Sequence, residues 1–139
     1  MPGLRWMMDT NAVSELIRQP AGPVAHRLAT EPPDAVCTNI VVASELRFGA
    51  QRKGSMVLTA RVDQLLAVLP VLPFAPPADE HCAAMRAALE RAGTPIGSHD
   101  LFIAAHARAL SLTLVTHNVR EFARVPGLAL QDWQGPAPA

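Results

Sequence analysis

The stretch "MMDTNAV", residues 7–13, places a carboxylate directly after a short apolar run near the start of the chain. The run over residues 4–8 is typical of a buried strand, and Asp9 stands where the chain passes into the next helical pattern. An aspartate there can cap the helix, because its side chain accepts hydrogen bonds from first-turn N–H groups. It can also be one ligand of a metal site. The second interpretation requires partners elsewhere in the chain.

Short apolar segments alternate with amphipathic ones along the whole chain. We predict strands over residues 4–8, 35–38, 71–74 and 112–116, and a weaker strand over 128–131. We predict helices over residues 11–18, 23–30, 40–53, 59–69, 79–92 and 98–110, and one helical turn after Asn118. This alternation is typical of βαβ units and predicts an α/β fold, a central parallel sheet with helices on both faces.

The chain shows no internal repeat and no linker long enough to separate two domains. We therefore expect one domain over residues 1–139, with a core over about 4–133 and a flexible tail over 134–139. Half of the residues are hydrophobic, which suffices for a single buried core. Twelve acidic residues balance twelve basic ones, so any binding of nucleic acid must come from a local patch.

Nothing in the sequence indicates a membrane or an oxidising compartment. No apolar run approaches the roughly 20 residues that span a bilayer, and Arg5 and Asp9 interrupt the N-terminal apolar stretch. The two cysteines, Cys37 and Cys82, form no CxxC motif and are interpreted as reduced structural thiols. We expect a soluble, cytoplasmic protein without a membrane partner. Trp6 and Trp133, near the two ends of the chain, are interpreted as packing anchors.

Two predicted helices each carry an acid on an apolar stripe. The helix neighbours of Glu45 at spacings of three and four are Val41, Val42, Phe48 and Gly49. On the helix of Asp100, the residues three, four and seven positions later are Ile103, Ala104 and Ala107. A buried carboxylate without a partner is costly, so each acid needs an arginine, a proton or a metal ion. An ion pair between Glu45 and a distant arginine remains an alternative.

Two predicted strand ends add oxygen-bearing side chains to these two acids. Asp9 and Asn118 each follow a strand, and the crevice of a parallel sheet lies outside the carboxyl ends of its strands. Acidic groups that meet there repel one another unless a cation holds them, and hard oxygen ligands select Mg²⁺ or Mn²⁺. Structural alternatives remain open, because Asp9 can be a helix cap and Asn118 with Glu121 fits a capping box.

Histidines offer a competing metal hypothesis. His99 and His106 stand seven apart on one predicted helix, and His117 precedes Asn118. Their spacing matches no HExxH or related zinc motif, so the sequence favours a carboxylate site over a zinc site.

Four segments together resemble a known family. "MMDTNAVSEL", "ASELRFGA", "GSHDLFIAAHARALSLTLVTHNVREF" and "VPGLALQDW" are similar to the PIN domain, in particular to its VapC-type ribonuclease toxin branch. The similarity runs from about Met7 to Trp133, and the order of the four motifs is specific, although each motif alone is weak.

The resemblance implies a Rossmann-like parallel sheet and an Mg²⁺-dependent ribonuclease, with Mn²⁺ as a substitute. It implies metal ligation by Asp9, Asp100 and Glu45, and it places Asn118 at the family's fourth acidic position, as a neutral ligand. Supporting polar groups would be Thr10, Asn11 and Thr116. His99 is left without a role.

The resemblance also implies a mechanism and partners. Water activated by the metal would attack phosphorus in line with the leaving 3′ oxygen and give 5′-phosphate and 3′-hydroxyl products. The expected partners are an RNA substrate, a VapB-like antitoxin that fills the active-site groove, and a second copy of the chain. Arg47, Arg86 and Arg108 are candidate phosphate contacts.

Other classes of protein fit less well. A haloacid-type phosphatase needs an aspartate two residues after the first, where this chain has Asn11. A receiver domain needs a lysine after a late strand, and the only lysine is Lys53. The remaining alternative is a degenerate PIN fold that acts only as a protein-interaction module, which the neutral Asn118 keeps open.

Overall fold

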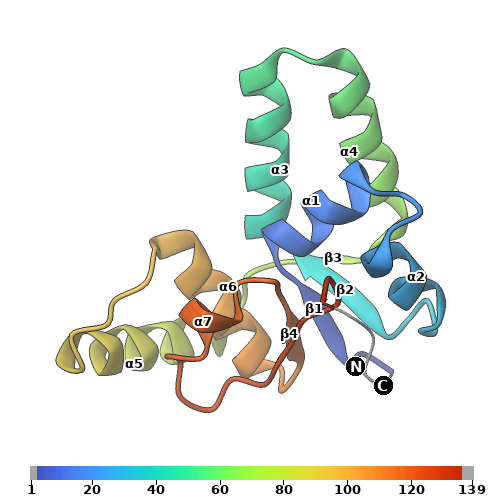
Figure 1. The fold of residues 1–139 in the computed structure, drawn as a ribbon. Helices are drawn as coiled ribbons and strands as arrows, with labels where there is room; N and C mark the ends of the chain where they lie inside the picture. Colours follow the sequence, from blue (N-terminus) through green and yellow to red (C-terminus); the bar gives the residue numbers. More distant parts are fainter. Residues whose placement is uncertain (1–2, 136–139) are drawn as a thin grey trace.

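A computed structural model describes residues 3–135, which form five parallel strands and seven helices (Figure 1). The order of strands in the sheet is β3-β2-β1-β4-β5, and every neighbouring pair is parallel. The strands are β1 (Trp6–Met8), β2 (Val36–Asn39), β3 (Val71–Leu72), β4 (Thr113–Val115) and β5 (Leu130–Gln131). The predicted α/β fold with a central parallel sheet is confirmed.

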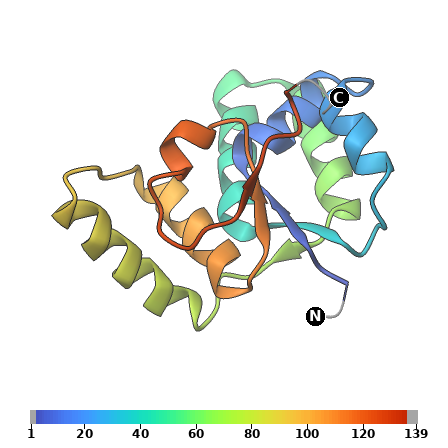
Figure 2. The same ribbon diagram turned by 60° about the horizontal axis from the view of Figure 1, so that its bottom comes forward.

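The helices cover the sheet from both sides. They are α1 (Thr10–Arg18), α2 (Pro23–Ala29), α3 (Ile40–Lys53), α4 (Met56–Val68), α5 (Ala78–Arg91), α6 (Ser98–Ala109) and α7 (Val119–Phe122). Helices α3 and α4 form a hairpin that projects from one side, whereas α5 packs along α6 on the other (Figures 1 and 2). Within residues 3–135, no helix is long and apolar enough to cross a membrane.

The strand order reverses at the centre of the sheet. Strand β1 pairs with β2 on one side and with β4 on the other, so Met8 lies beside Val115. In open α/β sheets such a reversal opens a crevice at the carboxyl ends of the two central strands. Asp9 follows β1 and Thr116 follows β4, so both lie at this crevice.

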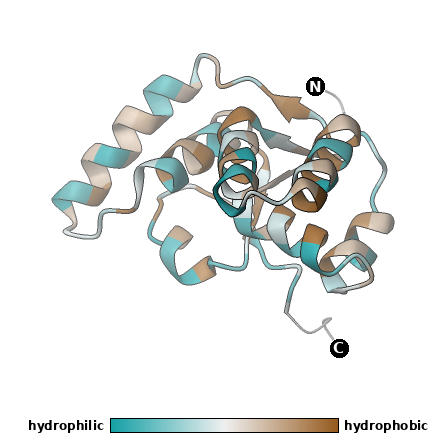
Figure 3. Ribbon diagram, turned by 90° about the horizontal axis from the view of Figure 1, so that it is seen from above, coloured by the Kyte–Doolittle hydropathy of each residue, from teal (hydrophilic) through white to brown (hydrophobic). Residues whose placement is uncertain are grey.

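The core lies between the sheet and the helices. Met7, Met8 and Leu114 of the central strands are completely buried, as is Ile103 of α6. Most helices carry apolar and polar residues on different sides (Figure 3). Helix α6 is the exception, because its residues 103–107 are all buried. A helix enclosed in this way can hold the side chain at its start, Asp100, in a fixed position.

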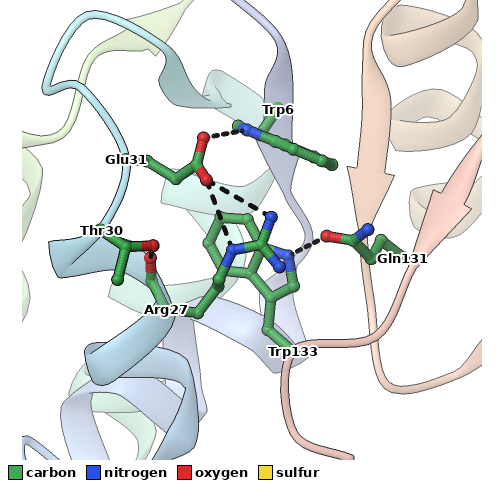
Figure 4. A network of polar contacts seen from close by, with 6 residues as sticks. All are labelled: Trp6, Arg27, Thr30, Glu31, Gln131 and Trp133. Carbon is green, nitrogen blue, oxygen red and sulfur yellow. Dashed lines mark hydrogen bonds and ion pairs between the residues drawn. The ribbon is translucent and has the colours of Figure 1, made fainter. Parts of the chain in front are cut away.

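An arginine contacts both tryptophans, which also pack edge-on against each other (Figure 4). The guanidinium of Arg27 lies 5.3 Å from the ring centre of Trp6 and 5.1 Å from that of Trp133, and it pairs with Glu31. Trp6 donates its ring N–H to Glu31 at 2.7 Å. These contacts join the C-terminal segment to β1 and α2, which confirms both tryptophans as packing anchors.

The largest differences from the predicted element bounds have local causes. Helix α4 begins at Met56 instead of residue 59, because the Ser55 hydroxyl accepts from the Leu58 N–H and caps it. Strand β3 ends at Leu72 instead of residue 74, because Pro73 has no N–H for the ladder. Of the predicted flexible tail, residues 136–139 lie outside the described residues.

Candidate active site

Asp9 is the most enclosed acid at the crevice, with 2% of its surface exposed. Its Oδ1 accepts a hydrogen bond from the Ala12 N–H at 2.8 Å, so the cap interpretation of Asp9 is confirmed. Burial raises the pKa of Asp9 to about 6, a hydrogen bond with the Thr116 side chain and the cap bond oppose the rise, and the charge of Glu45 adds to it. The Asp9 carboxylate therefore caps α1, while burial and the charge of Glu45 disfavour its ionised form.

Glu45 approaches the same crevice from α3. Its Oε1 accepts a hydrogen bond from the Thr10 hydroxyl at 2.8 Å, and His99 lies 3.6 Å from its Oε2. Thr10 thus acts as a support for Glu45, whereas Thr116 supports Asp9. No arginine pairs with Glu45 among the described residues, so the predicted alternative of a structural arginine pair is wrong.

The predicted apolar surroundings of Glu45 are only partly correct. Phe48 is 64% exposed, and the Glu45 side chain is 28% exposed. The core-facing stripe of α3 runs through Val42, Leu46 and Ala50, one position round the helix from Glu45. Glu45 therefore lies at the border of the core, where water relieves part of the cost of its charge.

Asp100 meets the other acids from the first turn of α6. Its pKa is raised to about 6, first by burial and then by the charges of Glu121, Asp9 and Glu45, in that order. The three predicted acids thus act on one another electrostatically. Between residues 3 and 135, no arginine or lysine forms an ion pair with Asp9 or Asp100.

Asn118 occupies the N-cap position of α7, but its side chain makes no cap hydrogen bond, so the capping-box interpretation is wrong. Its Nδ2 donates to Oε2 of Glu121 at 2.6 Å, and its backbone N–H donates to the Thr116 hydroxyl at 2.9 Å. Asn118 therefore holds Glu121 toward Asp100. We did not predict Glu121 as a site residue, although its spacing of three from Asn118 placed both on one side of the helical turn.

A second pair at the edge of the sheet was also missed. His117 lies 3.1 Å from Asp132, and the charge of His117 slightly lowers the pKa of Asp9. Asp132 directly follows β5, so the rule that drew attention to Asp9, an acid just after a strand, also identifies Asp132.

Other predicted residues are not joined to the acids. Asn11 is exposed, and no hydrogen bond in the described part of the chain links its side chain to the site. The histidines diverge, because His106 is buried beside Asn39 whereas His99 and His117 contact different acids. Residues 3–135 contain no group of three His, Cys, Asp or Glu side chains already arranged around an ion position.

The chemistry of the cluster nevertheless suits a hard divalent cation. Burial and mutual repulsion disfavour the ionised forms of Asp9 and Asp100, and a cation reverses both effects at once. All four acids offer oxygen ligands, which Mg²⁺ and Mn²⁺ prefer over nitrogen or sulfur. Asp9, Glu45, Asp100 and Glu121 are the residues that could hold it.

The three predicted arginine contacts are engaged within the chain. Arg47 pairs with Asp63, and Arg86 lies 3.6 Å from Glu90. Arg108 donates to His81 at 2.9 Å and to the Pro126 carbonyl at 2.8 Å. These contacts leave the guanidinium groups able to bind phosphate, but none of them directs a guanidinium group toward Asp9, Glu45 or Asp100.

A groove begins beside Glu45 and runs between α1 and the α3–α4 hairpin. It encloses about 170 Å³. Thr10 and Glu45 line one part, apolar residues such as Leu46 and Val62 line its wall, and Arg18 and Lys53 supply positive charge. The groove thus combines an apolar wall with both signs of charge.

Comparisons with known proteins point to one family. The PIN domain model matches residues 7–128. The chain is 34% identical over 131 residues to the tRNA(fMet)-specific endonuclease VapC of Salmonella typhimurium, covering 94% of this chain and 98% of that protein. It is 32% identical over 131 residues to ribonuclease VapC2 of Haemophilus influenzae, with the same two coverages.

A solved structure shows the same fold. VapBC2 from Rickettsia felis, bound to a DNA fragment from its promoter, superposes with a TM-score of 0.88 at 30% identity. The match covers 94% of this chain and 99% of that one. With the sheet order, the acid cluster and these similarities together, the chain belongs to the PIN domain family.

Proposed function

We propose that this chain is a divalent-metal-dependent ribonuclease and the toxin of a VapBC-type toxin–antitoxin pair. The observation that carries the proposal is the meeting of two acids at the crevice, the buried Asp9 and the half-buried Asp100, whose pKa values are both raised to about 6. No lysine or arginine in residues 3–135 pairs with either acid. Near-full-length similarity to VapC ribonucleases supports RNA as the substrate class.

Each site residue has a distinct role in this proposal. Asp9, Asp100 and Glu45 hold Mg²⁺ or Mn²⁺, and Glu121 supplies the negative charge that Asn118 lacks at the fourth position. Thr10 and Thr116 orient Glu45 and Asp9. The exposed Asn11, next to Thr10, is retained as a polar contact for RNA. These roles belong to one PIN-like domain with its core over residues 4–133.

The acids also prepare the site for hydrolysis. When bound, a divalent cation would lower the pKa of water, so that hydroxide is available as the nucleophile at neutral pH, and would polarise the phosphate. Asp9 is held rigidly by the Ala12 N–H and Thr116, so its position does not change as charge develops. Glu45 is more exposed and therefore better placed to accept the proton of the attacking water.

The substrate and protein partners follow from the same comparisons. Because a relative is named as tRNA(fMet)-specific, tRNA is the first substrate class to examine. We propose that a VapB-like antitoxin occupies the groove beside Glu45, since such a segment would cover Thr10 and Glu45. We also propose a homodimer.

The alternative of a non-catalytic interaction module is disfavoured, because the three acids are intact and influence one another.

Cleavage by the purified protein tests the proposal. We expect RNA to be cut in the presence of Mg²⁺ or Mn²⁺ and not after chelation. Asp9→Asn and Asp100→Asn should abolish cleavage, whereas Asp63→Asn, which changes a surface acid paired with Arg47, should not. Sequencing of RNA 5′ ends after induced expression, beside an Asp9→Ala control, identifies the cut sites. Equal cleavage by wild type and both site variants would contradict the proposal.

A further inference from the structure

A buried polar contact lies beneath the acid cluster and uses none of its residues. Asn39, the last residue of β2, is completely buried, and its Oδ1 accepts the Val42 N–H at 2.9 Å as the cap of α3. Its Nδ2 lies 3.1 Å from Nδ1 of His106 and 3.8 Å from the sulfur of Met7. His106 is itself only 3% exposed.

The hydrogen bonds fix the direction of this contact. The Val42 N–H can only donate, so the oxygen of the Asn39 amide must face it, and the NH₂ group must face His106. Nδ1 of His106 is therefore the acceptor, and the imidazole is neutral with its proton on Nε2. Burial lowers the pKa of His106, which favours the same neutral form.

The contact joins the two helices that carry site acids. Asn39 caps α3, which bears Glu45 six residues later, and His106 lies on α6 six residues after Asp100. The packing of α3 against α6 thus sets how Glu45 and Asp100 face each other. The only other ion pair or side-chain hydrogen bond between these helices in residues 3–135 joins Glu45 to His99, which is 66% exposed.

An apolar pair would fill the same space without the cost of burying polar groups. A hydrogen bond adds direction, because it is satisfied at one relative placement of the two helices. The ring of Phe74 packs edge-on against His106 at 5.5 Å and leaves the imidazole little freedom to turn. The contact is therefore suited to hold α3 and α6 in register.

We propose that the Asn39–His106 hydrogen bond is a positioning contact for the metal site: it sets Glu45 against Asp100, and its loss weakens binding of a divalent cation although every ligand remains. The inference rests on the proposed function, because it assumes that the acids bind a cation. Asn39 and His106 are positioning residues in this account and do not touch the cation or the RNA.

The test measures Mn²⁺ binding to the whole protein by calorimetry, without RNA. His106→Leu removes the acceptor, and Asn39→Ser removes the donor while a serine still caps α3. We expect each variant to weaken Mn²⁺ binding by about tenfold, the size typical of partners behind metal ligands. The double variant should be no weaker than either single variant, because both lose the same contact.

Two further variants separate positioning from general stability. His106→Asn places a side-chain oxygen near the former Nδ1 and should restore Mn²⁺ affinity to within about threefold of wild type. Val24→Ala, at a buried position of α2, should lower the melting temperature and leave Mn²⁺ affinity unchanged. A ¹⁵N NMR spectrum of the wild type, which needs no variant to fold, should show His106 protonated at Nε2 and bare at Nδ1.

Three results would overturn the positioning role alone: wild-type affinity in His106→Leu, additive losses in the double variant, or a proton on Nδ1 of His106. A loss of affinity in Val24→Ala as large as that in His106→Leu would likewise assign the effect to stability. A wild-type protein that binds no Mn²⁺ and cleaves no RNA would overturn the proposed function, and this inference with it.

Discussion

Asn118 and Glu121 stand three residues apart at the start of α7, and the amide of Asn118 donates a hydrogen bond of 2.6 Å to the Glu121 carboxylate. Through this bond the neutral Asn118 positions the carboxylate of Glu121. Glu121 is in turn the charged group with the largest effect on the pKa of Asp100. The fourth acid of the cluster therefore comes from a different position of the motif than the sequence indicated.

Asn118→Asp should destabilise the metal-free protein and increase its response to metal. The new carboxylate would face Glu121 without a donor between them, at a cost of about 1 kcal/mol or roughly 3 °C in melting temperature. Mn²⁺ should then raise the melting temperature of the variant more than that of wild type, because the cation relieves the added repulsion. Thermal melts with and without Mn²⁺ measure this. Equal metal-induced gains in both proteins would count against it.

Glu121→Gln should lower the pKa of Asp100 from about 6 toward its ordinary value of 3.8, because the charge of Glu121 is the largest cause of the rise after burial. The variant keeps an oxygen that can accept from Asn118. NMR titration of the Asp100 carboxyl carbon measures the pKa. Glu90→Gln, a surface change on α5, is the control and should leave the pKa of Asp100 unchanged. An unaltered Asp100 titration in Glu121→Gln would show that Glu121 lies too far away to act.

Asp9→Asn should stabilise the metal-free protein at pH 7. The folded-state pKa of Asp9, about 6, lies above its ordinary 3.8, so the folded protein binds the proton more tightly than the unfolded chain does. The resulting penalty is absent below pH 4, grows between pH 4 and 6, and is complete above pH 6. Its upper bound is about 3 kcal/mol, from roughly two pKa units, and asparagine caps α1 about as well as aspartate.

Urea denaturation at pH 4 and pH 7 tests this prediction. The stability gain of Asp9→Asn over wild type should be present at pH 7 and nearly vanish at pH 4, since the wild-type carboxyl is then protonated in the folded state. A variant that is less stable than wild type at pH 7 would mean that the Asp9 charge has a stabilising partner in the protein.

Thr10→Val should reduce cleavage without abolishing it. The substitution keeps the shape of the side chain and removes the hydroxyl that donates to Glu45 at 2.8 Å. Loss of a group that orients a metal ligand typically costs about tenfold or more in activity. Cleavage rates across a Mn²⁺ titration measure the effect. Thr59→Val, which removes an exposed hydroxyl bonded to the Ser55 carbonyl on α4, should leave the rate unchanged. If the two variants behave alike, Thr10 does not orient Glu45.

Arg27→Met should destabilise the fold and spare the active site. It removes the guanidinium that lies over the rings of both Trp6 and Trp133 and pairs with Glu31. We expect a loss of about 1–3 kcal/mol in the free energy of unfolding, because two cation–π contacts and the charged partner of the half-buried Glu31 are lost together. Urea denaturation measures it, and Mn²⁺ affinity should be unchanged. Arg18→Met, which breaks one exposed pair with Glu15, is the matched control and should cost less.

Local chemistry explains what the sequence predicted well. Helix α3 has the predicted bounds, because Asn39 caps its start and Gly54, in a left-handed conformation, ends it. Every other strand and helix was located within a few residues, since prolines, glycines and apolar periodicity act over short distances. Asp9, Glu45 and Asp100 could be chosen in the same way, because each is an acid in an apolar pattern or directly after a strand.

Only the tertiary structure decided which groups those acids meet. Apolar periodicity could not place Phe48 outside, because a shift of one position round the helix separates a core position from a border position and the α3–α4 packing selects between them. The sequence could not show that Asn118 holds Glu121 or that Asn39 meets His106 from 67 residues away. Residue types and spacing determine where helices and strands form and which side chains can offer oxygen ligands. The distances between elements determine the charges, pKa values and hydrogen bonds of the site, because these interactions depend on separation in space and not along the chain.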